Sequence, residues 1–411
     1  MDKKIISEYS ILFFYCTLLS ILTGWAISFF LHSLDIVTSG RWEFPYIIYF
    51  LPLAGIIIYI TYTKWLGKYN DGNQAIINDL TNNSLSVRPA LTPLVYAGTI
   101  LTHLFGGSAG REGTAIQMGA GIGALLSKKL NLNIKTRNYL LRAGVSAGFA
   151  AVFGTPIAGT IFAFEFLRQK KINYKALLLC LYSSILAHLT TISSGTIHSE
   201  YEISPLTTFH IFGFSCSVKY IFISMVTAIV FGGCALLYKK FIKLLKTKIV
   251  FAIKREWMRP VIGGILLLTI ALLLPINDYL GLGVLSQSES GVSITEAFSS
   301  HSIPYYAFLI KMILTAITLS FGFKGGEVTP MFFIGATLGN SLGMLMHMYG
   351  VPLSLSFLVG LGFVSVFAAA SKTPLTSSVL GVEIFGMENA LYFFIACFTA
   401  NFFSGKKSIY N

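Results

Sequence analysis

Two acidic turns are the segments of this sequence whose residues could handle ions. The first is Gly110-Arg111-Glu112-Gly113-Thr114, and the second is Gly325-Gly326-Glu327-Val328-Thr329. The first stands at the start of an apolar helix predicted over 113–126, whose free backbone amides, beginning at Gly113, can hold an anion. A carboxylate tethered at the same point can compete with that anion or carry a proton. The turns therefore predict an anion pathway.

The composition indicates a polytopic membrane protein. Hydrophobic residues make up 54% of the 411 residues, charged residues make up 11%, and the mean hydropathy is +0.71. Long apolar stretches recur at 10–31, 45–62, 137–164, 174–192, 219–238, 260–275, 305–321 and 388–403. We expect an all-α protein without a soluble domain, and we expect the first stretch to be a retained helix rather than a cleaved signal.

The net charge of +13 reflects basic residues in the short connections between apolar stretches. Such a distribution is typical of cytoplasmic loops that contact membrane lipid, and it argues against a role in binding nucleic acid. It predicts that the N- and C-termini are cytoplasmic. The stretches 193–204 and 286–303 are expected to face outward. The basic groups are Lys3, Lys4, Lys128, Lys129, Lys135, Arg168, Lys170, Lys171, Lys239, Lys240, Lys243, Lys246, Lys248, Lys406 and Lys407.

The cysteines and histidines carry no sign of a metal or cofactor site. The five cysteines lie in apolar segments without a CxxC pair, and the seven histidines are scattered. His103 alone lies close to the first turn, where a hydrogen bond at a helix end is a better explanation than proton carriage. We expect no metal, no cofactor and no disulfide.

An internal repeat organises the chain. Glu112 is followed by the glycines of 119–123, by Thr155-Pro156 and by Glu165, nine residues after the proline. Glu327 is followed by the glycines of 335–339, by Thr373-Pro374 and by Glu383, again nine residues after the proline. Duplicated, Gly- or Pro-interrupted apolar segments are typical of transporters whose site lies between the repeats. We predict one membrane domain with a first repeat over 1–205 and a second over 206–411.

These residues resemble the CLC family of chloride channels and proton-coupled anion antiporters. The resemblance rests on the GREGT turn, the segment Ala143 through Gly159, the turn Gly325 through Pro330 and the segment Gly405 through Tyr410, and it covers roughly 70–411. The family implies an inverted repeat of many short, tilted and broken transmembrane helices. It also implies a homodimer in the cell (plasma) membrane with one anion pathway per subunit.

Two departures from the chloride-type pattern point to the fluoride-exporting branch of that family. Chloride-type members resemble GSGIP at an early turn, whereas this chain has Asp71 to Ala75 (DGNQA) there, without the serine. They resemble GGIFAP at the later turn, whereas Glu327 and Thr329 stand there in this chain. The run Thr102 to Gly107 (THLFGG) is also similar to the fluoride branch. The resemblance therefore implies a fluoride/proton antiporter.

Physical chemistry gives the second turn a role in binding fluoride. Fluoride is small and strongly hydrated, so replacing its water requires close, strong hydrogen-bond donors. Burial within the membrane favours a neutral Glu327, which could donate to fluoride, while Thr329 donates or holds the carboxyl and Asn73 adds an amide donor. The alternative is that Glu327 is a satisfied carboxyl that caps the next helix.

Glu112 is the predicted gating and proton-coupling residue. As a carboxylate it mimics an anion, occupies the pathway near the helix amides and is released when protonated. The alternative is a plain ion pair with Arg111. The resemblance places a tyrosine hydroxyl at Tyr410 facing the anion, although an ordinary C-terminal anchor is equally compatible.

Two further glutamates and two other transport functions are also to be considered. Glu165 and Glu383 are expected to be structural, and the family's inner proton-path glutamate aligns with Phe166, which puts that route in doubt. A passive anion channel would need no carboxyl at 327, and a chloride antiporter would keep the early serine. Because the chain has no HExxH, GxSxG or phosphate loop, we expect a transporter rather than an enzyme.

Overall fold

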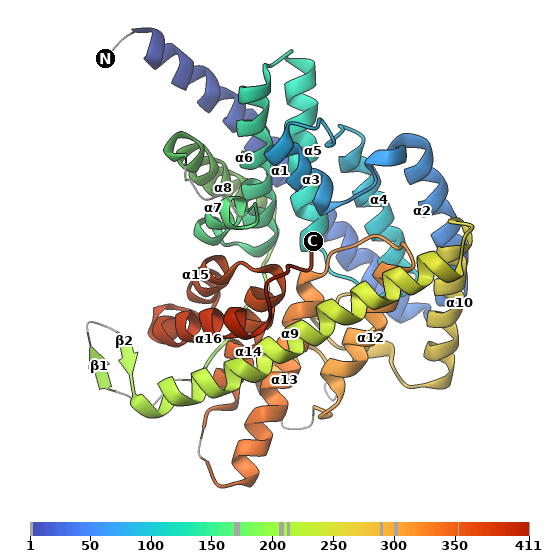
Figure 1. The fold of residues 1–411 in the computed structure, drawn as a ribbon, viewed down its shortest axis with the longest axis vertical. Coiled ribbons are helices and arrows are strands. Elements are labelled where there is room, and N and C mark those ends of the chain that lie inside the picture. Colours follow the sequence, from blue (N-terminus) through green and yellow to red (C-terminus); the bar gives the residue numbers. More distant parts are fainter. Residues whose placement is uncertain are drawn as a thin grey trace. The chain divides into compact units, whose positions relative to one another are not determined.

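The protein is almost entirely helical (Figure 1). The computed structural model describes residues 3–167, 173–204, 209–211, 214–287, 291–299, 303–351 and 353–410. Within these ranges two short strands, β1 (Phe209–Ile211) and β2 (Phe214–Cys216), pair as an antiparallel hairpin. The predicted all-α class is confirmed. Of the predicted loop features, Arg168, Lys170, Lys171 and parts of the stretch 286–303 lie outside the described residues.

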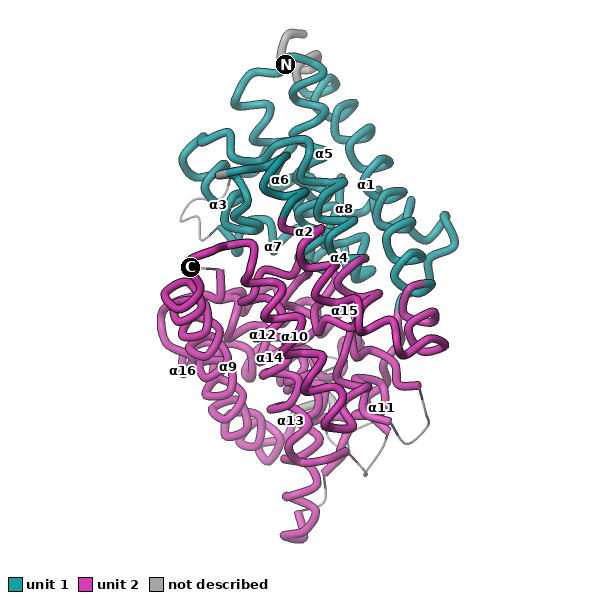
Figure 2. Tube along the Cα trace, turned by 90° about the vertical axis from the view of Figure 1, so that its right-hand side faces the viewer, with its two compact units in different colours: residues 1–36, 60–100, 112–198 teal, residues 37–59, 101–111, 199–411 magenta. Residues whose placement is uncertain are grey.

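Two compact units are distinguished by their internal contacts (Figure 2). Unit 1 comprises residues 1–36, 60–100 and 112–198. Its helices are most of α1 (Lys3–Glu43), the end of α2 (Leu51–Trp65), η2 (Gly67–Tyr69), α3 (Asn73–Asn82), most of α4 (Leu91–Leu104), α5 (Glu112–Lys129), α6 (Ile134–Phe153), α7 (Pro156–Glu165) and α8 (Tyr174–Ser193).

Unit 2 comprises residues 37–59, 101–111 and 199–411. It takes the ends of α1 and α4 and the start of α2, and it includes η1 (Pro45–Phe50) and the hairpin. Its other helices are α9 (Val218–Ala252), α10 (Met258–Leu273), η3 (Asn277–Tyr279), α11 (Ile294–Ser299), α12 (Ala307–Ser320), α13 (Val328–Met348), α14 (Leu355–Ser371), α15 (Pro374–Phe385), η4 (Met387–Asn389) and α16 (Ala390–Phe403). The halves 1–205 and 206–411 stay a prediction, since the units follow contacts rather than the repeat.

The repeated Thr-Pro turns break a helix in the same way in both units. α6 ends where Gly154 adopts a φ of +76°, and Pro156 then opens α7. α14 ends where Lys372 adopts a φ of +67°, and Pro374 then opens α15. A left-handed residue stops a helix, and proline is tolerated in the first turn of the next one. The repeated sequence therefore produces a repeated pair of broken helices.

Glycines bring the central helix pair of each unit into backbone contact. In unit 1, a Cβ on Gly119 of α5 would fall on the carbonyl of Gly144 of α6. In unit 2, a Cβ on Gly335 of α13 would fall on the carbonyl of Gly362 of α14. Small residues at such crossings let apolar helices approach closely, which is how helices associate without a hydrophobic driving force.

Five helical segments of the described chain are long and apolar enough to cross a membrane. They are Tyr9–Glu43, Pro45–Trp65, Tyr174–Ser193, Val218–Ala252 and Val328–Met348. Shorter apolar helices of 10–17 residues accompany them, including α4, α7, α10, α12, α14 and α15. This mixture of long and short apolar helices agrees with the predicted pattern of broken transmembrane segments.

We predict that Gly335→Ala destabilises the protein. The added methyl group must displace the backbone of α14, and such overpacking costs about 1–3 kcal/mol. The midpoint of thermal unfolding in detergent should therefore fall. Gly233→Ala in α9 is the matched control, because in the described chain no atom beyond its own stretch of helix lies within 4 Å of the added Cβ. An unchanged midpoint for Gly335→Ala would show that the helix pair tolerates separation.

Candidate functional site

A backbone bridge joins the two acidic turns at Gly110 and Gly326. The amide of Gly110 donates to the carbonyl of Gly326 at 2.6 Å, and the amide of Gly326 donates to the carbonyl of Gly110 at 2.7 Å. Gly325 has a φ of +154°, and a Cβ there would lie 2.5 Å from the Cβ of Ala109. Glycine is therefore required at 325, where any side chain would be both strained and obstructed.

Buried polar side chains support the residues just before the bridge. The amide of Ser108 donates to Oγ1 of Thr318 at 3.1 Å, and the Ser108 hydroxyl lies 3.0 Å from that of Thr315. Nε2 of His103 lies 3.0 Å from the carbonyl of Ala109. The predicted helix-end hydrogen bond of His103 is confirmed. It links the end of α4 to the backbone just before the first turn.

Glu327 occupies the N-cap position of α13, yet its side chain makes no capping hydrogen bond. The alternative that this carboxyl merely caps the helix is therefore wrong. The residue is half-buried. Beside it, Thr329 is only 2% exposed, and its hydroxyl accepts from the amide of Arg111 at 3.4 Å. The carboxyl interacts with its own backbone and with Lys246 rather than capping α13.

Glu112 is the first helical residue of α5 and is 2% exposed. The adjacent Gly113 is also buried. α13 begins with Val328, one position after Glu327, whereas Gly119 and Gly335 each lie seven residues after the start of their helix. The sequence repeat is thus one residue out of register at the glutamates. One carboxyl projects from the first turn of a helix and the other from the residue before it, so they are not equivalent.

Asn73 opens α3 and is tied to α5. Its Oδ1 accepts from Nε2 of Gln117 at 3.1 Å, and Asn73 is 8% exposed. With the amide oxygen engaged by Gln117, Nδ2 of Asn73 is the group that can donate to an anion. Sequence reasoning missed Gln117, although a single amide side chain among the small and apolar residues of 115–126 is a usable signal.

A buried ion pair fixes α3 against α6 within unit 1. Nη2 of Arg137 donates to Oδ2 of Asp79 at 2.8 Å and to the carbonyl of Val87 at 3.1 Å. The amide of Val87 donates back to Oδ2 of Asp79 at 2.8 Å. Both charges are hydrogen-bonded, which is the condition for a buried pair to be tolerated. Asp79 and Arg137 thereby hold the helix that presents Asn73, a function that the sequence did not indicate.

The C-terminal segment that carries Tyr410 is held by a buried lysine of α9. Nζ of Lys239 donates to the carbonyls of Ala369, Ser404 and Lys407 at 3.0, 2.9 and 2.9 Å. Tyr410 is 9% exposed. The segment is therefore packed against α9 and α14, which fits both the site role and the anchoring role considered for Tyr410.

Tyr238, next to Lys239, lies among the acidic and phenolic groups of unit 2. Its ring is fully buried, and its hydroxyl interacts electrostatically with Glu327 and with Tyr410. Lys246 of the same helix also interacts with Glu327. Unit 2 thus places Glu327 within electrostatic range of two residues of α9, Tyr238 and Lys246. The sequence gave no reason to select Tyr238, because it lies in an apolar helix among other aromatics.

Phe166 does not supply a substitute acid. It follows the last residue of α7, it is 5% exposed, and its ring stacks on Phe162 with centroids 5.0 Å apart. Glu165 and Glu383 lie near the ends of α7 and α15, and both are half-buried. Their expected structural role stays a prediction.

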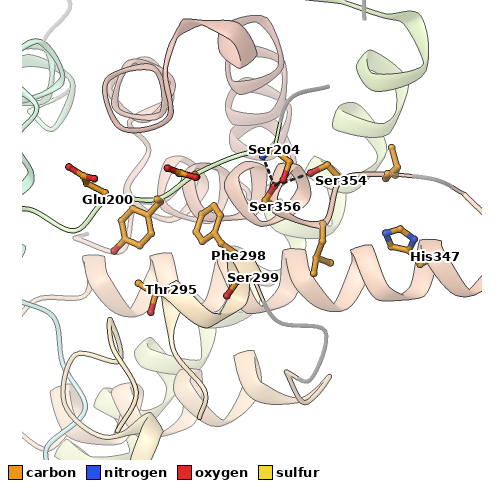
Figure 3. A pocket seen from close by; sticks show the side chains of 12 residues that line it. Glu200, Ser204, Thr295, Phe298, Ser299, His347, Ser354 and Ser356 are labelled. Carbon is orange, nitrogen blue, oxygen red and sulfur yellow. Dashed lines mark hydrogen bonds between the residues drawn. The ribbon is translucent and has the colours of Figure 1, made fainter. Parts of the chain in front are cut away.

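A polar pocket of about 640 Å³ in unit 2 is separate from the predicted site (Figure 3). Glu200, Ser204, Ser354 and Ser356 are among its lining residues, and hydrogen bonds join the three serines on one side of it. None of the predicted site residues lines it. Among the described residues there is no cluster of three or more histidine, cysteine, aspartate or glutamate side chains that could hold a metal.

The predicted site residues divide between the units. Asn73, Glu112 and Gly113 belong to unit 1, where Asn73 is joined to α5 through Gln117. The other three belong to unit 2 and are Glu327, Thr329 and Tyr410. Each set includes a buried or half-buried carboxyl at a helix start, where unpaired amides favour an anion. Chemically, each start can hold either an anion or its own carboxylate.

Comparison with known proteins gives consistent matches. The sequence profile of the family described as Voltage gated chloride channel matches residues 53–405. A Chloride/fluoride channel protein of Pseudomonas syringae pv. tomato is 37% identical over 401 residues, which are 96% of this chain and 84% of that protein. The H(+)/Cl(-) exchange transporter ClcA of Yersinia pestis is 25% identical over 336 residues, covering 78% of this chain and 66% of that protein.

Solved structures give the same fold. The crystal structure of a CLC-type fluoride/proton antiporter matches with a TM-score of 0.88 and 31% identity, covering 100% of this chain and 98% of that chain. A slow cyanobacterial Cl⁻/H⁺ antiporter matches with a TM-score of 0.75 at 17% identity, over 97% of this chain and 96% of that one. The bridged turns, the repeated broken helices and these matches establish that the chain belongs to the CLC, or voltage gated chloride channel, family of membrane anion transporters.

Proposed function

We propose that this protein is a fluoride/proton antiporter that exports fluoride from the cytoplasm, driven by inward proton movement. The observation that carries the proposal is the Glu327 carboxyl, which stands at the start of α13 without capping it. The 31% identity to a CLC-type fluoride/proton antiporter over the whole chain supports the same function.

Glu327 suits fluoride for a physical reason. A half-buried carboxyl in a membrane protein is stabilised in its neutral form, which offers one strong O–H donor. Fluoride is a stronger and smaller acceptor than chloride, so it gains more from a short, charge-assisted hydrogen bond. The buried hydroxyl of Thr329 either adds a donor or holds the carboxyl. Within unit 2, Tyr410 offers a further hydroxyl donor. Within unit 1, Asn73 offers an amide donor, and the amides from Gly113 onward attract an anion.

Glu112 couples the two ions. As a carboxylate, it occupies the place of an anion near the amides of α5, and protonation releases it. Alternating occupation by fluoride and by this side chain moves fluoride and protons in opposite directions. The Glu112 residue is 2% exposed, at the first turn of α5.

Placement in the membrane follows from the basic loops. We propose a multi-pass protein of the cell (plasma) membrane with both termini in the cytoplasm, because basic residues near the ends of apolar segments favour the cytoplasmic side. The expected basic connection at 239–248 is corrected, since Lys239, Lys240, Lys243, Lys246 and Lys248 lie within α9. A homodimer with one pathway per subunit is the expectation drawn from the family.

A passive anion channel is the second candidate, because the relative at 37% identity is named a Chloride/fluoride channel protein. The test is a flux measurement on purified protein in liposomes. We expect fluoride efflux, followed with an electrode, to be accompanied by proton uptake and by little chloride flux. Comparable chloride flux would favour a general anion antiporter, and fluoride flux without protons would favour a channel.

Glu112→Gln should abolish proton coupling. Glutamine keeps the size of the side chain but can neither become an anion mimic nor exchange a proton. In the liposome assay, a fluoride gradient should then no longer drive proton movement. Coupled pumping by this variant would remove Glu112 from the mechanism.

Glu327→Gln should slow fluoride flux by at least about tenfold, because replacing a carboxyl donor with an amide weakens one strong hydrogen bond. Glu383→Gln is the matched control, since Glu383 is also a half-buried glutamate of unit 2. Initial rates of fluoride efflux compare the two variants. Equal effects would show that Glu327 has no special place at the site.

A further inference from the structure

A pocket of about 300 Å³ lies at the end of α1, away from the acidic turns in the sequence. It is lined by Arg41 and Trp42 of α1, by residues of η1, by the end of α10 and by residues within 277–287. All of these belong to unit 2. Nothing in the proposed transport mechanism uses this pocket.

Arg41 is the unusual member of the lining. Its side chain is only 7% exposed, and its Nε is buried without a hydrogen-bond partner in the described part of the chain. A guanidinium does not lose its charge in proteins, and burying an unsatisfied donor of a charged group is costly. Arg41 therefore lines the pocket with a guanidinium that the described chain leaves incompletely hydrogen-bonded.

The charges around Arg41 favour an anionic acceptor. Asp278 is the carboxylate that interacts with Arg41, and its Oδ2 already accepts from the amide of Val292 at 2.9 Å. A second buried cation, Lys311, also interacts with Arg41. Lys311 is satisfied by the carbonyls of Tyr279 and Gly281 at 3.0 and 2.8 Å. Asp278 is thus already engaged by a backbone amide and Lys311 by two carbonyls, so Arg41 is the charged side chain that lines the pocket.

The rim of the pocket is aromatic and apolar. Tyr46 and Tyr49 of η1 are 59% and 55% exposed, and Leu272 of α10 is 58% exposed. Arg41 and Trp42 lie in the last turn of the apolar segment Tyr9–Glu43, which is long enough to cross a membrane. Tryptophan and tyrosine are enriched at the depth of lipid headgroups. The pocket therefore combines a buried cation with the side chains that contact lipid.

We propose that this pocket binds the phosphate headgroup of a membrane phospholipid, with Arg41 contacting the phosphate. The planar guanidinium fork matches phosphate geometry, and the aromatic rim accommodates the glycerol and acyl chains. A free inorganic anion would use the guanidinium but would gain nothing from the apolar rim. The proposal is independent of the ion that the protein transports.

Fluorescence of Trp42 provides the test, because this tryptophan lines the pocket. The background variant carries Trp25→Phe, Trp65→Phe and Trp257→Phe, which replace side chains that are 58%, 60% and 46% exposed. Phosphatidylglycerol with brominated acyl chains is titrated into the detergent-solubilised protein. We expect Arg41→Gln to require about tenfold more lipid for half-maximal quenching, as the loss of one charged hydrogen bond implies.

Matched variants and ligands make the outcome decisive. Arg255→Gln removes an exposed arginine outside the pocket and should leave quenching unchanged. A normal size-exclusion profile and retained anion flux for Arg41→Gln establish that the variant is folded. Quenching that is equal with and without Arg41 would overturn the proposal. Displacement of the lipid by millimolar inorganic phosphate would also overturn it in favour of a free-anion site.

Discussion

The reciprocal hydrogen bonds between Gly110 and Gly326 are the constraint on which the site in unit 2 depends. These two backbone segments are more than 200 residues apart in the sequence. They can form reciprocal amide-to-carbonyl hydrogen bonds only where no side chain lies between them. Ala109 and Gly325 approach so closely that a Cβ at 325 has no room. Because the bridge fixes residues 109–111 and 325–327 together, the start of α13 is aimed by backbone geometry rather than by flexible side chains.

The helices that follow these turns also pack closely because glycines stand at their contacts. α5 on α6 and α13 on α14 touch through glycines at equivalent places, such as Gly119 and Gly335. Yet Glu112 begins its helix whereas Glu327 precedes the start of its own. A symmetric scaffold therefore presents two carboxyls in different local settings. That difference is compatible with the two roles that we propose, a gate for Glu112 and a hydrogen-bond donor for Glu327.

Much of this architecture could be predicted from the sequence, because it is encoded locally. The apolar stretches, the Thr-Pro breaks at Pro156 and Pro374 and the glycine-rich turns are short patterns with direct conformational consequences. The contacts that hold the site were not predictable in this way. Asp79 and Arg137 are 58 residues apart, and Asn73 and Gln117 are 44 apart, so their pairing depends on how helices pack. Single-sequence reasoning also could not tell that Glu327 leaves its helix uncapped.

The buried cations show how the fold treats charge in an apolar setting. Arg137 is paired with a carboxylate, while the ammonium groups of Lys239 and Lys311 donate hydrogen bonds to backbone carbonyls. Each is thus a structural clamp whose donors are used within the protein. Arg41 differs, since its Nε is buried without such a partner in the described chain and it stands where a membrane-spanning segment ends. The described chain supplies acceptors to Arg137, Lys239 and Lys311, whereas the proposed lipid phosphate supplies one to Arg41.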